Sequence, residues 1–291
     1  MITIAITAFK EPVSIGKAIE AITSQKISEE YELICSCPDD ETAAVIMEYS
    51  KHNPAIKYLK DPGCGKYTAL NMIFARSKGR IIIMTDGDVW MASGSIKAMA
   101  DSFSDPKVGL ATGMPVSANP RSNMWGYWSH LLTEAGAHTI RMDKVAKGEP
   151  FSISGYLWAV RKGVIEKLPL DVAEDAVAPY LALAKGWKIA YAQGAKVFVR
   201  YPTNWRDWYT QKVRSIRCSK NLCKYVDARY MRTFGAEASA AGRALHYADS
   251  FKELVWTFSL MAARTAAWIG AWSENIRKDY GEGWERIEST K

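Results

Sequence analysis

Short strand-like segments alternate with helix-like segments through the first third of the chain, and this alternation restricts the fold more than any other feature. The patterns predict strands at residues 2–8, 31–37, 56–59 and 81–85, and helices at residues 15–22, 40–51 and 66–77. Residues 81–85 are almost wholly apolar, which is typical of a strand buried on both faces of a parallel sheet. Alternating strands and helices build βαβ units. We therefore predict an α/β fold with a doubly wound, mostly parallel sheet flanked by helices.

The pattern becomes less regular after residue 113, although no linker rich in proline or serine interrupts it. Strands are predicted at 151–154, 157–161 and around Ile189, and helices at 174–185 and 204–225. The remaining residues are predicted to form a helical C-terminal segment. We expect one continuous unit whose successive parts are residues 1–112, 113–225 and 226–291.

The composition excludes several classes of protein. With 291 residues, 48% of them hydrophobic and 24% charged, the chain is neither disordered nor of low complexity. Its five cysteines are odd in number and none forms a C-x-x-C pair, so neither a disulfide scaffold nor a zinc ribbon is expected. The first predicted strand starts at residue 2, which leaves no room for a signal peptide. These features predict a cytoplasmic location.

Positive charge is concentrated in one stretch. Ten basic and only two acidic residues lie between Lys196 and Arg232, whereas the whole chain has 38 Lys and Arg against 31 Asp and Glu. Such a stretch predicts an anionic partner, which could be a phosphorylated ligand, a lipid headgroup surface or a nucleic acid. The alternative is a solvated basic helix face, and charge alone does not separate the two interpretations.

Acidic residues follow the predicted strands, where an open parallel sheet binds its ligands. Asp86-Gly87-Asp88 comes directly after the apolar run at 81–85, and Asp39-Asp40-Glu41 follows the second strand. Two carboxylates separated by one glycine form a compact oxygen-rich site for a divalent cation that carries substrate phosphates. Asp-Gly-Asp alone is more often a plain turn. Its position at a strand end, with acids at a neighbouring strand end, favours a cation site.

An ordered set of motifs resembles glycosyltransferase family 2, including its membrane-linked synthases. The matching segments are Ala8-Phe9-Lys10-Glu11, Asp39-Asp40, Gly65-Lys66-x-x-Ala69-Leu70-Asn71, Asp86-Gly87-Asp88, Glu174-Asp175 and Gln211-x-x-Arg214. The resemblance covers roughly residues 1–217 and implies the GT-A fold. It also implies inverting, metal-assisted transfer of a sugar from a nucleotide-diphosphate-sugar, expected to be UDP-linked, to a hydroxyl acceptor. Ser215 follows Arg214 where processive synthases have Trp, which argues against processive polymerisation.

The resemblance implies a role for each matching residue. The nucleotide-sugar site would comprise Ala8, Glu11, Asp39, Lys66, Asp86, Gln211 and Arg214. Asp88 and Asp86 would hold Mn²⁺ or Mg²⁺. Asp175, with Glu174 beside it, would supply the general base. The floor of the acceptor site would consist of Gly155, Tyr156 and Trp158. Residues 1–112 would then bind the donor, and residues 113–225 would bind the acceptor and carry out catalysis. Two simpler interpretations stay open, namely that Glu174-Asp175 merely begins a helix and that Trp158 is a core residue.

The segment from Leu254 to Trp272 carries a single charge, that of Arg264. Nineteen residues can just span a bilayer, but an arginine near the centre costs about 2.5–3.5 kcal/mol. The segment therefore favours an amphipathic helix that lies on a membrane or docks on the catalytic unit. Together with the basic stretch, it predicts an enzyme at the cytoplasmic face of an anionic membrane, acting on a lipid-linked or glycan acceptor. The competing interpretation is a soluble enzyme.

Two other functions share some of these sequence features. A sugar-phosphate nucleotidyltransferase would also pair a doubly wound sheet with metal-binding Asp, but its Gly-rich N-terminal loop is absent, because Phe9-Lys10-Glu11 follows the first strand. A nucleic-acid-binding protein could use residues 196–232, but acids at the strand ends would repel phosphate unless they bound metal. We expect no nucleic-acid partner.

Overall fold

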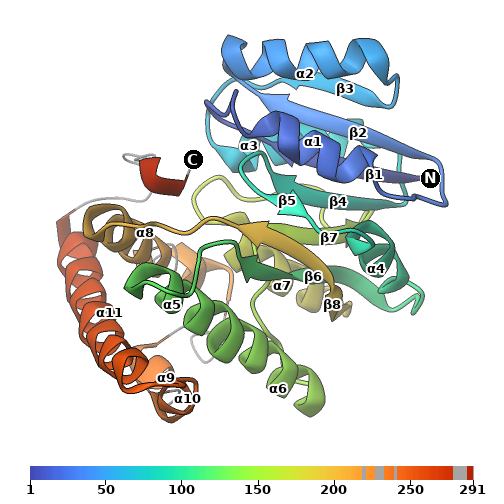
Figure 1. Cartoon of the computed structure of the whole chain (residues 1–291). Helices are drawn as coiled ribbons and strands as arrows, with labels where there is room; N and C mark the ends of the chain where they lie inside the picture. Colours follow the sequence, from blue (N-terminus) through green and yellow to red (C-terminus); the bar gives the residue numbers. More distant parts are fainter. Residues whose placement is uncertain (218–220, 227–232, 239–240, 278–286, 291) are drawn as a thin grey trace.

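Eight strands form a single sheet in the order β3-β2-β1-β4-β7-β6-β8-β5 (Figure 1). The computed structural model describes residues 1–217, 221–226, 233–238, 241–277 and 287–290. The strands are β1 (Ile2–Thr7), β2 (Tyr31–Cys37), β3 (Ile56–Lys60), β4 (Ile81–Asp86), β5 (Trp90–Met91), β6 (Val108–Ser117), β7 (Leu157–Arg161) and β8 (Lys188–Val199). The pairs β1–β2, β2–β3, β1–β4 and β6–β8 are parallel, whereas β7 is antiparallel to β4 and β6, and β5 to β8. The predicted α/β class with a mostly parallel, doubly wound sheet is confirmed.

Helices cover both faces of this sheet (Figure 1). They are α1 (Ile15–Thr23), α2 (Asp40–His52), α3 (Lys66–Arg76), α4 (Ser95–Asp101), α5 (Met124–Leu131), α6 (Thr139–Lys147), α7 (Glu174–Ala184), α8 (Trp205–Arg217), α9 (Phe234–Ala238), α10 (Ala241–His246) and α11 (Phe251–Arg277). Successive side chains of a strand point to opposite faces. Ile81 and Ile83 therefore join the core under α1, α2 and α4, while Ile82 and Met84 join the core under α3 and α7.

The sequence patterns located the first four strands and three helices to within about two residues, because each has a clear apolar period. The strand predicted around Ile189 is confirmed and extends over Lys188–Val199. Two predictions were wrong, because residues 151–154 are not a strand and the helix predicted at 204–225 is the shorter α8, Trp205–Arg217. A 3₁₀ turn at Asn221–Lys224 follows, beyond residues 218–220, which lie outside the described part. The division expected between residues 112 and 113 falls within β6, so both halves share one sheet.

Helix α11 packs beside α8 and α5 through small residues (Figure 1). Ala267 and Ala271 contact Val213 and Ile216 of α8. Arg264, the one charged residue of the segment from Leu254 to Trp272, is buried and pairs with Glu237, at 2.5 Å from Nε to Oε1. Within the described residues, none of the helices is long and apolar enough to cross a bilayer. Docking on the protein therefore accounts for one face of α11.

Candidate active site

The site begins where β1 and β4 end side by side. Thr7 lies opposite Asp86 in the parallel register, and its Oγ1 donates to Asp86 Oδ1 at 3.2 Å. Gly87 continues from Asp86 with its N–H bonded to Thr7 O at 3.0 Å. A Cβ on Gly87 would overlap the Glu11 carboxylate and lie 2.7 Å from Ala8 Cβ. Only glycine therefore allows this turn to lie against the end of β1.

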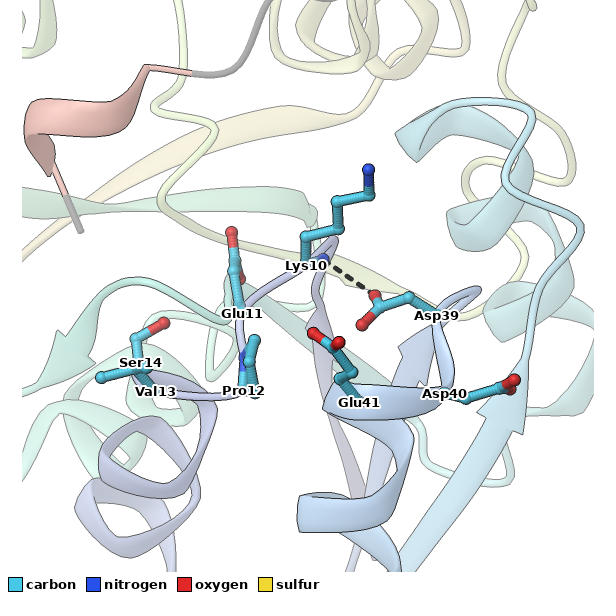
Figure 2. Close-up of a pocket in the computed structure, with 8 residues that line it drawn as sticks. All are labelled: Lys10, Glu11, Pro12, Val13, Ser14, Asp39, Asp40 and Glu41. Carbon is cyan, nitrogen blue, oxygen red and sulfur yellow. Dashed lines mark hydrogen bonds between the residues drawn. The ribbon is translucent and has the colours of Figure 1, made fainter.

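A pocket of about 610 Å³ opens beside this turn, between the ends of β1 and β2. Figure 2 shows its lining, which consists of Lys10, Glu11, Pro12, Val13, Ser14, Asp39, Asp40 and Glu41. Lys10 has a φ of 55°, a left-handed conformation that is uncommon for residues other than glycine. This turn lets Lys10 N–H donate to Asp39 Oδ2 at 2.8 Å, while Thr42 N–H donates to Oδ1 at 2.9 Å. Burial would raise the pKa of Asp39, but these hydrogen bonds outweigh it and lower the pKa.

Lys66 is the charge centre of the site. Its Nζ lies 2.5 Å from Asp86 Oδ1 and 3.0 Å from Glu174 Oε1, and it donates to Gly155 O at 3.2 Å. The three partners come from the end of β4, the first turn of α7 and the loop before β7. Burial alone would lower the pKa of Lys66, but the two carboxylates outweigh it and raise the pKa. The lysine is therefore charged at neutral pH, as a cation buried between anions should be.

Asp175 lies next to this centre, at the N-terminus of α7. A Cβ placed on Gly155 would be 3.1 Å from Asp175 Oδ2, so the glycine lets the loop approach the carboxylate. The pKa of Asp175 is raised to about 6, first by burial and then by the charge of Glu174, against the opposing effect of Lys66. The pKa of Asp86 is also raised to about 6, first by burial and also by Asp88. Two acids that titrate near neutrality are what proton-transfer chemistry uses.

Tyr156 connects the carboxylates to α8. Its backbone oxygen accepts a hydrogen bond from Thr85 Oγ1 at 2.8 Å, which places the residue at the end of β4. The pKa of Tyr156 is raised, first by burial and then by the charges of Asp88 and Asp86, while Arg214 acts in the opposite direction. Arg214 of α8 therefore lies within electrostatic reach of the same group as the carboxylates.

The structure thus brings together most of the residues that the sequence predicts. Around Lys66 it gathers Asp86, Asp88, Gly155, Tyr156, Glu174, Asp175 and Arg214, and beside them Ala8, Glu11 and Asp39. Their individual roles stay predictions. Trp158 is a correction, because its side chain is fully buried against Phe74, with ring centroids 6.4 Å apart, and cannot form an acceptor surface. The Oε1 of Gln211 accepts a hydrogen bond from Lys212 Nζ at 3.4 Å, and the proposed contact of Gln211 with the diphosphate stays a prediction.

A divalent metal would have two carboxylates here. In the part of the chain that the structure describes, no three His, Cys, Asp or Glu side chains gather closely enough to hold a metal among themselves. Asp86 and Asp88 nevertheless fit a cation of the Mg²⁺ or Mn²⁺ type, which typically takes one or two carboxylates and completes its shell with water and substrate phosphates.

The predicted basic face is divided among several partners. Lys224 pairs with Asp171 at 2.7 Å, and Arg217 pairs with Glu274 at 3.0 Å. The charge of Arg214 acts on Tyr156 at the site. Lys220, Arg229 and Arg232 lie outside the described residues. The stretch from 196 to 232 is therefore not a single solvated helix face.

Sequence reasoning missed a second cation near Asp175. Arg141 of α6 is only 7% exposed. Burial lowers the pKa of its guanidinium, and the nearby charge of Asp175 acts in the opposite direction. Nothing in the sequence singles it out, because one arginine in a helix that also carries Lys144 and Lys147 looks like part of a solvated face.

Residues 1–218 match the family described as "Glycosyltransferase like family 2". A curated relative, "Probable glycosyltransferase YdaM" of Bacillus subtilis (strain 168), is 25% identical over 251 residues, or 80% of this chain. The chain spans 57% of the length of that relative.

Two solved structures have a similar fold. The mannosyltransferase PcManGT from Pyrobaculum calidifontis, in complex with GDP-Man and Mn²⁺, matches with a TM-score of 0.66 at 18% identity over 95% of this chain and 87% of that chain. TarS 1-349 of S. aureus matches with a TM-score of 0.51 at 14% identity over 95% of this chain and 80% of that chain. The GT-A fold expected from the sequence is confirmed.

Proposed function

The chain belongs to glycosyltransferase-like family 2, and we propose that it transfers a sugar from a nucleotide-diphosphate-sugar to an acceptor hydroxyl. The observation that carries this proposal is the convergence of Asp86, Glu174 and Asp175 around Lys66, at the ends of elements far apart in sequence. We expect an inverting single displacement, in which the acceptor attacks the anomeric carbon on the face opposite the diphosphate. Family membership favours this function over a nucleotidyltransferase or a nucleic-acid-binding protein.

The donor would lie across the ends of β1, β2 and β4. The pocket at Asp39 is large enough for a nucleoside, and Lys10 lies at its edge (Figure 2). Asp86 and Asp88 would hold Mn²⁺ or Mg²⁺, which would neutralise charge on the leaving diphosphate. Arg214 would pair with the same diphosphate through its planar guanidinium. Lys66 would keep Asp86 ionised and oriented, because it contacts that carboxylate from the side of α3.

Asp175 would take the proton from the acceptor hydroxyl as the new glycosidic bond forms. Its raised pKa of about 6 suits this role better than an ordinary carboxylate, because it is basic enough to accept a proton yet ionised at pH 7. Glu174 would support it by holding Lys66, whose positive charge opposes further protonation of the cluster. Gly155 and Tyr156 would border the acceptor.

A donor screen tests the proposal. Nucleotide binding and sugar release are measured for UDP-sugars, the donors that the resemblance implies, and for GDP-sugars, with Mn²⁺, Mg²⁺ or EDTA. We expect one base to bind at least tenfold more tightly than the other, and only with metal. Asp88→Asn should abolish this turnover and weaken diphosphate binding while the protein stays folded. Near-normal turnover of that variant at saturating metal would refute the metal site. A product that keeps the anomeric configuration of the donor, determined by NMR, would refute inversion.

We also propose that the enzyme works at the surface of a membrane, on its cytoplasmic face. Large apolar side chains of α11 point away from the protein, including Phe251 at 81% exposure and Trp272 at 70%, with Val255, Phe258 and Ile269 between them. Aromatic and apolar residues on a helix favour the headgroup region. The acceptor would then be lipid-linked or a membrane-proximal glycan.

Co-sedimentation with anionic and neutral vesicles tests this second proposal. We expect binding to anionic vesicles, weakened by salt, and lost when Phe258 and Trp272 are both replaced by Ser. Replacing buried Ala267 by Ser is the matched control for a polar change elsewhere on the same helix. Lack of binding at low salt would refute the membrane proposal and leave sugar transfer untouched.

A further inference from the structure

Arg141 is a buried cation on α6. Its Nε donates to Ser152 O at 3.1 Å, and its guanidinium carbon lies 5.8 Å from the centroid of the Tyr191 ring. Its Nη1 is buried, and among the described residues it has no hydrogen-bond partner. No described Asp or Glu side chain forms an ion pair with it. Burying a charge without a directly paired opposite charge is costly, so this arrangement needs a reason.

The hydrogen bond to Ser152 does not provide that reason. It holds the loop that leads into Gly155 and Tyr156, but a neutral donor such as a glutamine amide could make the same bond. A guanidinium has five N–H donors, and only some of them are used here. Tyr191 also interacts with the guanidinium, through its ring face and its hydroxyl, and Asp175 acts on it from further away. The buried Nη1 is still left without a hydrogen-bond partner among the described residues.

His138 and Tyr191 place further polar groups beside Arg141. His138 Nδ1 lies 2.7 Å from the Tyr191 hydroxyl, and the two rings are 5.7 Å apart between centroids. The pKa of His138 is lowered, first by burial and then by the charge of Arg141, with Glu134 acting in the opposite direction and Lys196 adding a smaller lowering effect. Both His138 and Tyr191 are half-buried, so their side chains are partly open to solvent beside Arg141.

This group of residues also lies beside the proposed base. The charge of Asp175 acts on the guanidinium of Arg141. The charge of Arg141 in turn opposes the rise in the pKa of Tyr201 that burial causes. The Tyr201 ring packs edge-to-face on Tyr156, with ring centroids 6.2 Å apart. Arg141 belongs to the half of the chain after residue 113, whereas the donor pocket is built from the ends of β1 and β2. The cation is therefore on the acceptor's part of the site.

We propose that Arg141, with His138 and Tyr191, binds an oxyanion of the acceptor, a phosphate or a carboxylate, next to the hydroxyl that Asp175 deprotonates. The planar guanidinium pairs with such groups through two parallel hydrogen bonds. An anion seated there would supply the missing counter-charge and occupy the unused donors. This inference rests on the proposed function, because it names the class of acceptor for that site.

The test measures binding by calorimetry in protein saturated with Mn²⁺ and the nucleoside diphosphate that binds, so that the donor phosphate site is filled. The probes are glucose 6-phosphate against glucose, glucuronate against glucose, and decyl phosphate against decyl glucoside below its micellar concentration. We expect at least one oxyanion probe to bind at least tenfold more tightly than its neutral match. A preference for decyl phosphate would identify a lipid phosphate, and a preference for glucose 6-phosphate or glucuronate a soluble or glycan acceptor.

Variants attribute the binding to Arg141. Arg141→Gln should weaken binding of the oxyanion at least tenfold and leave nucleotide binding within twofold, whereas Arg141→Lys should lie between the two. Arg243→Gln is the matched control, because Arg243 is an exposed arginine that pairs with Asp143 of the same helix α6, and it should change nothing.

Equal binding of charged and neutral probes by the wild-type protein would overturn the proposal, as would unchanged binding in a folded Arg141→Gln protein. If Arg141→Gln fails to fold, the wild-type probe series and Arg141→Lys decide. Intact nucleotide binding in the same samples separates failure of this inference from failure of the proposed sugar transfer.

Discussion

The Nζ of Lys66 lies 3.0 Å from Oε1 of Glu174, and this contact joins the first turn of α3 to the first turn of α7. The glutamate side chain is 7% exposed and that of the lysine 17%. The same ammonium group also contacts Asp86, so one cation links the proposed metal site to the proposed base. The charge state of Lys66 therefore influences both halves of the reaction.

Lys66→Met should destabilise the protein strongly at neutral pH. Removing one partner of a buried ion pair typically costs about 3–5 kcal/mol. The raised pKa of Lys66 means that its stabilising charge is fully present below pH 10.5, so the wild-type protein has this contribution at pH 7. The loss should be smaller at pH 5, where Asp86 is protonated. Urea unfolding at both pH values measures it.

Lys60→Met is the control for this experiment, because Lys60 contacts Asp40 at 3.3 Å on the surface, and both side chains are exposed. Its effect should stay within about 0.5 kcal/mol. A Lys66→Met protein as stable as Lys60→Met would show that the buried contacts contribute nothing.

Asp175→Asn should reduce kcat by several orders of magnitude and leave donor affinity almost unchanged, because the proposed base acts on the acceptor. Glu174→Gln should reduce stability as well as turnover, since Glu174 is buried against Lys66. Steady-state kinetics combined with nucleotide binding separates the two. If Glu174→Gln lost more turnover than Asp175→Asn while both stayed folded, the roles of the two acids would have to be exchanged.

The pH dependence of turnover should show the raised pKa of Asp175. A base with a pKa of about 6 is mostly protonated at pH 5, so kcat/KM for the acceptor, which reports the groups of the free enzyme, should fall about tenfold between pH 7 and pH 5. An aspartate with an ordinary pKa near 3.9 would leave kcat/KM nearly constant over that range. A flat profile down to pH 5 would rule out Asp175 as the titrating base.

The same shift has a consequence for stability with a definite sign. Because folding raises the pKa of Asp175, the folded state binds this proton more tightly than the unfolded state, and acidification from about pH 6 to pH 4 favours folding through this group. Asp175→Asn should therefore be more stable than wild type at pH 7, and the difference should vanish near pH 4. Thermal unfolding of both proteins across this range measures it.

Gly87→Ala should disturb the donor site directly. The added methyl would overlap the Glu11 carboxylate and approach Ala8, so the end of β4 must shift. Overpacking of this kind costs about 1–3 kcal/mol. Gly136→Ala is the matched control, because the nearest atom to its new Cβ is Leu131 O at 3.6 Å, an ordinary contact. Nucleotide binding should fall for Gly87→Ala only, and equal losses in both variants would point to a general effect.

The elements up to β4 could be read from the sequence because each is simple. Ile15, Ala18, Ile19 and Ile22 recur at helical spacing and all are buried in α1, and the residues of β4 are apolar because both faces are covered. The C-terminal end of α8 could not be predicted, since charged residues continue past Arg217 without a helix-stop signal such as glycine or proline. Tertiary contacts of Asn221 and Tyr225 with Asp171 determine the structure there instead.

The site was predictable where residues act in short motifs and not where they act across the fold. Asp86, Asp88 and Asp175 follow strands or begin helices, which marks them in the sequence. The contact of Lys66 with Glu174 depends on how α3 and α7 sit on one face of the sheet, and no local pattern records it. Trp158 shows the opposite problem, because its sequence neighbours Gly155 and Tyr156 are at the site while its own side chain points into the core.

The hydrogen-bonded register of β4 with β7 has a consequence for how such an enzyme can adapt. Thr85 pairs with Leu157, so the backbone that carries Asp86 and the backbone that follows Gly155 are neighbouring strands of one sheet. Backbone hydrogen bonds between the two strands therefore fix the spacing between the proposed donor-binding and acceptor-binding groups. A hinge between two rigid halves is not available at this seam. Substrates of different size would have to be accommodated by the loops and helices outside the sheet, which can vary without changing the distance over which the sugar moves.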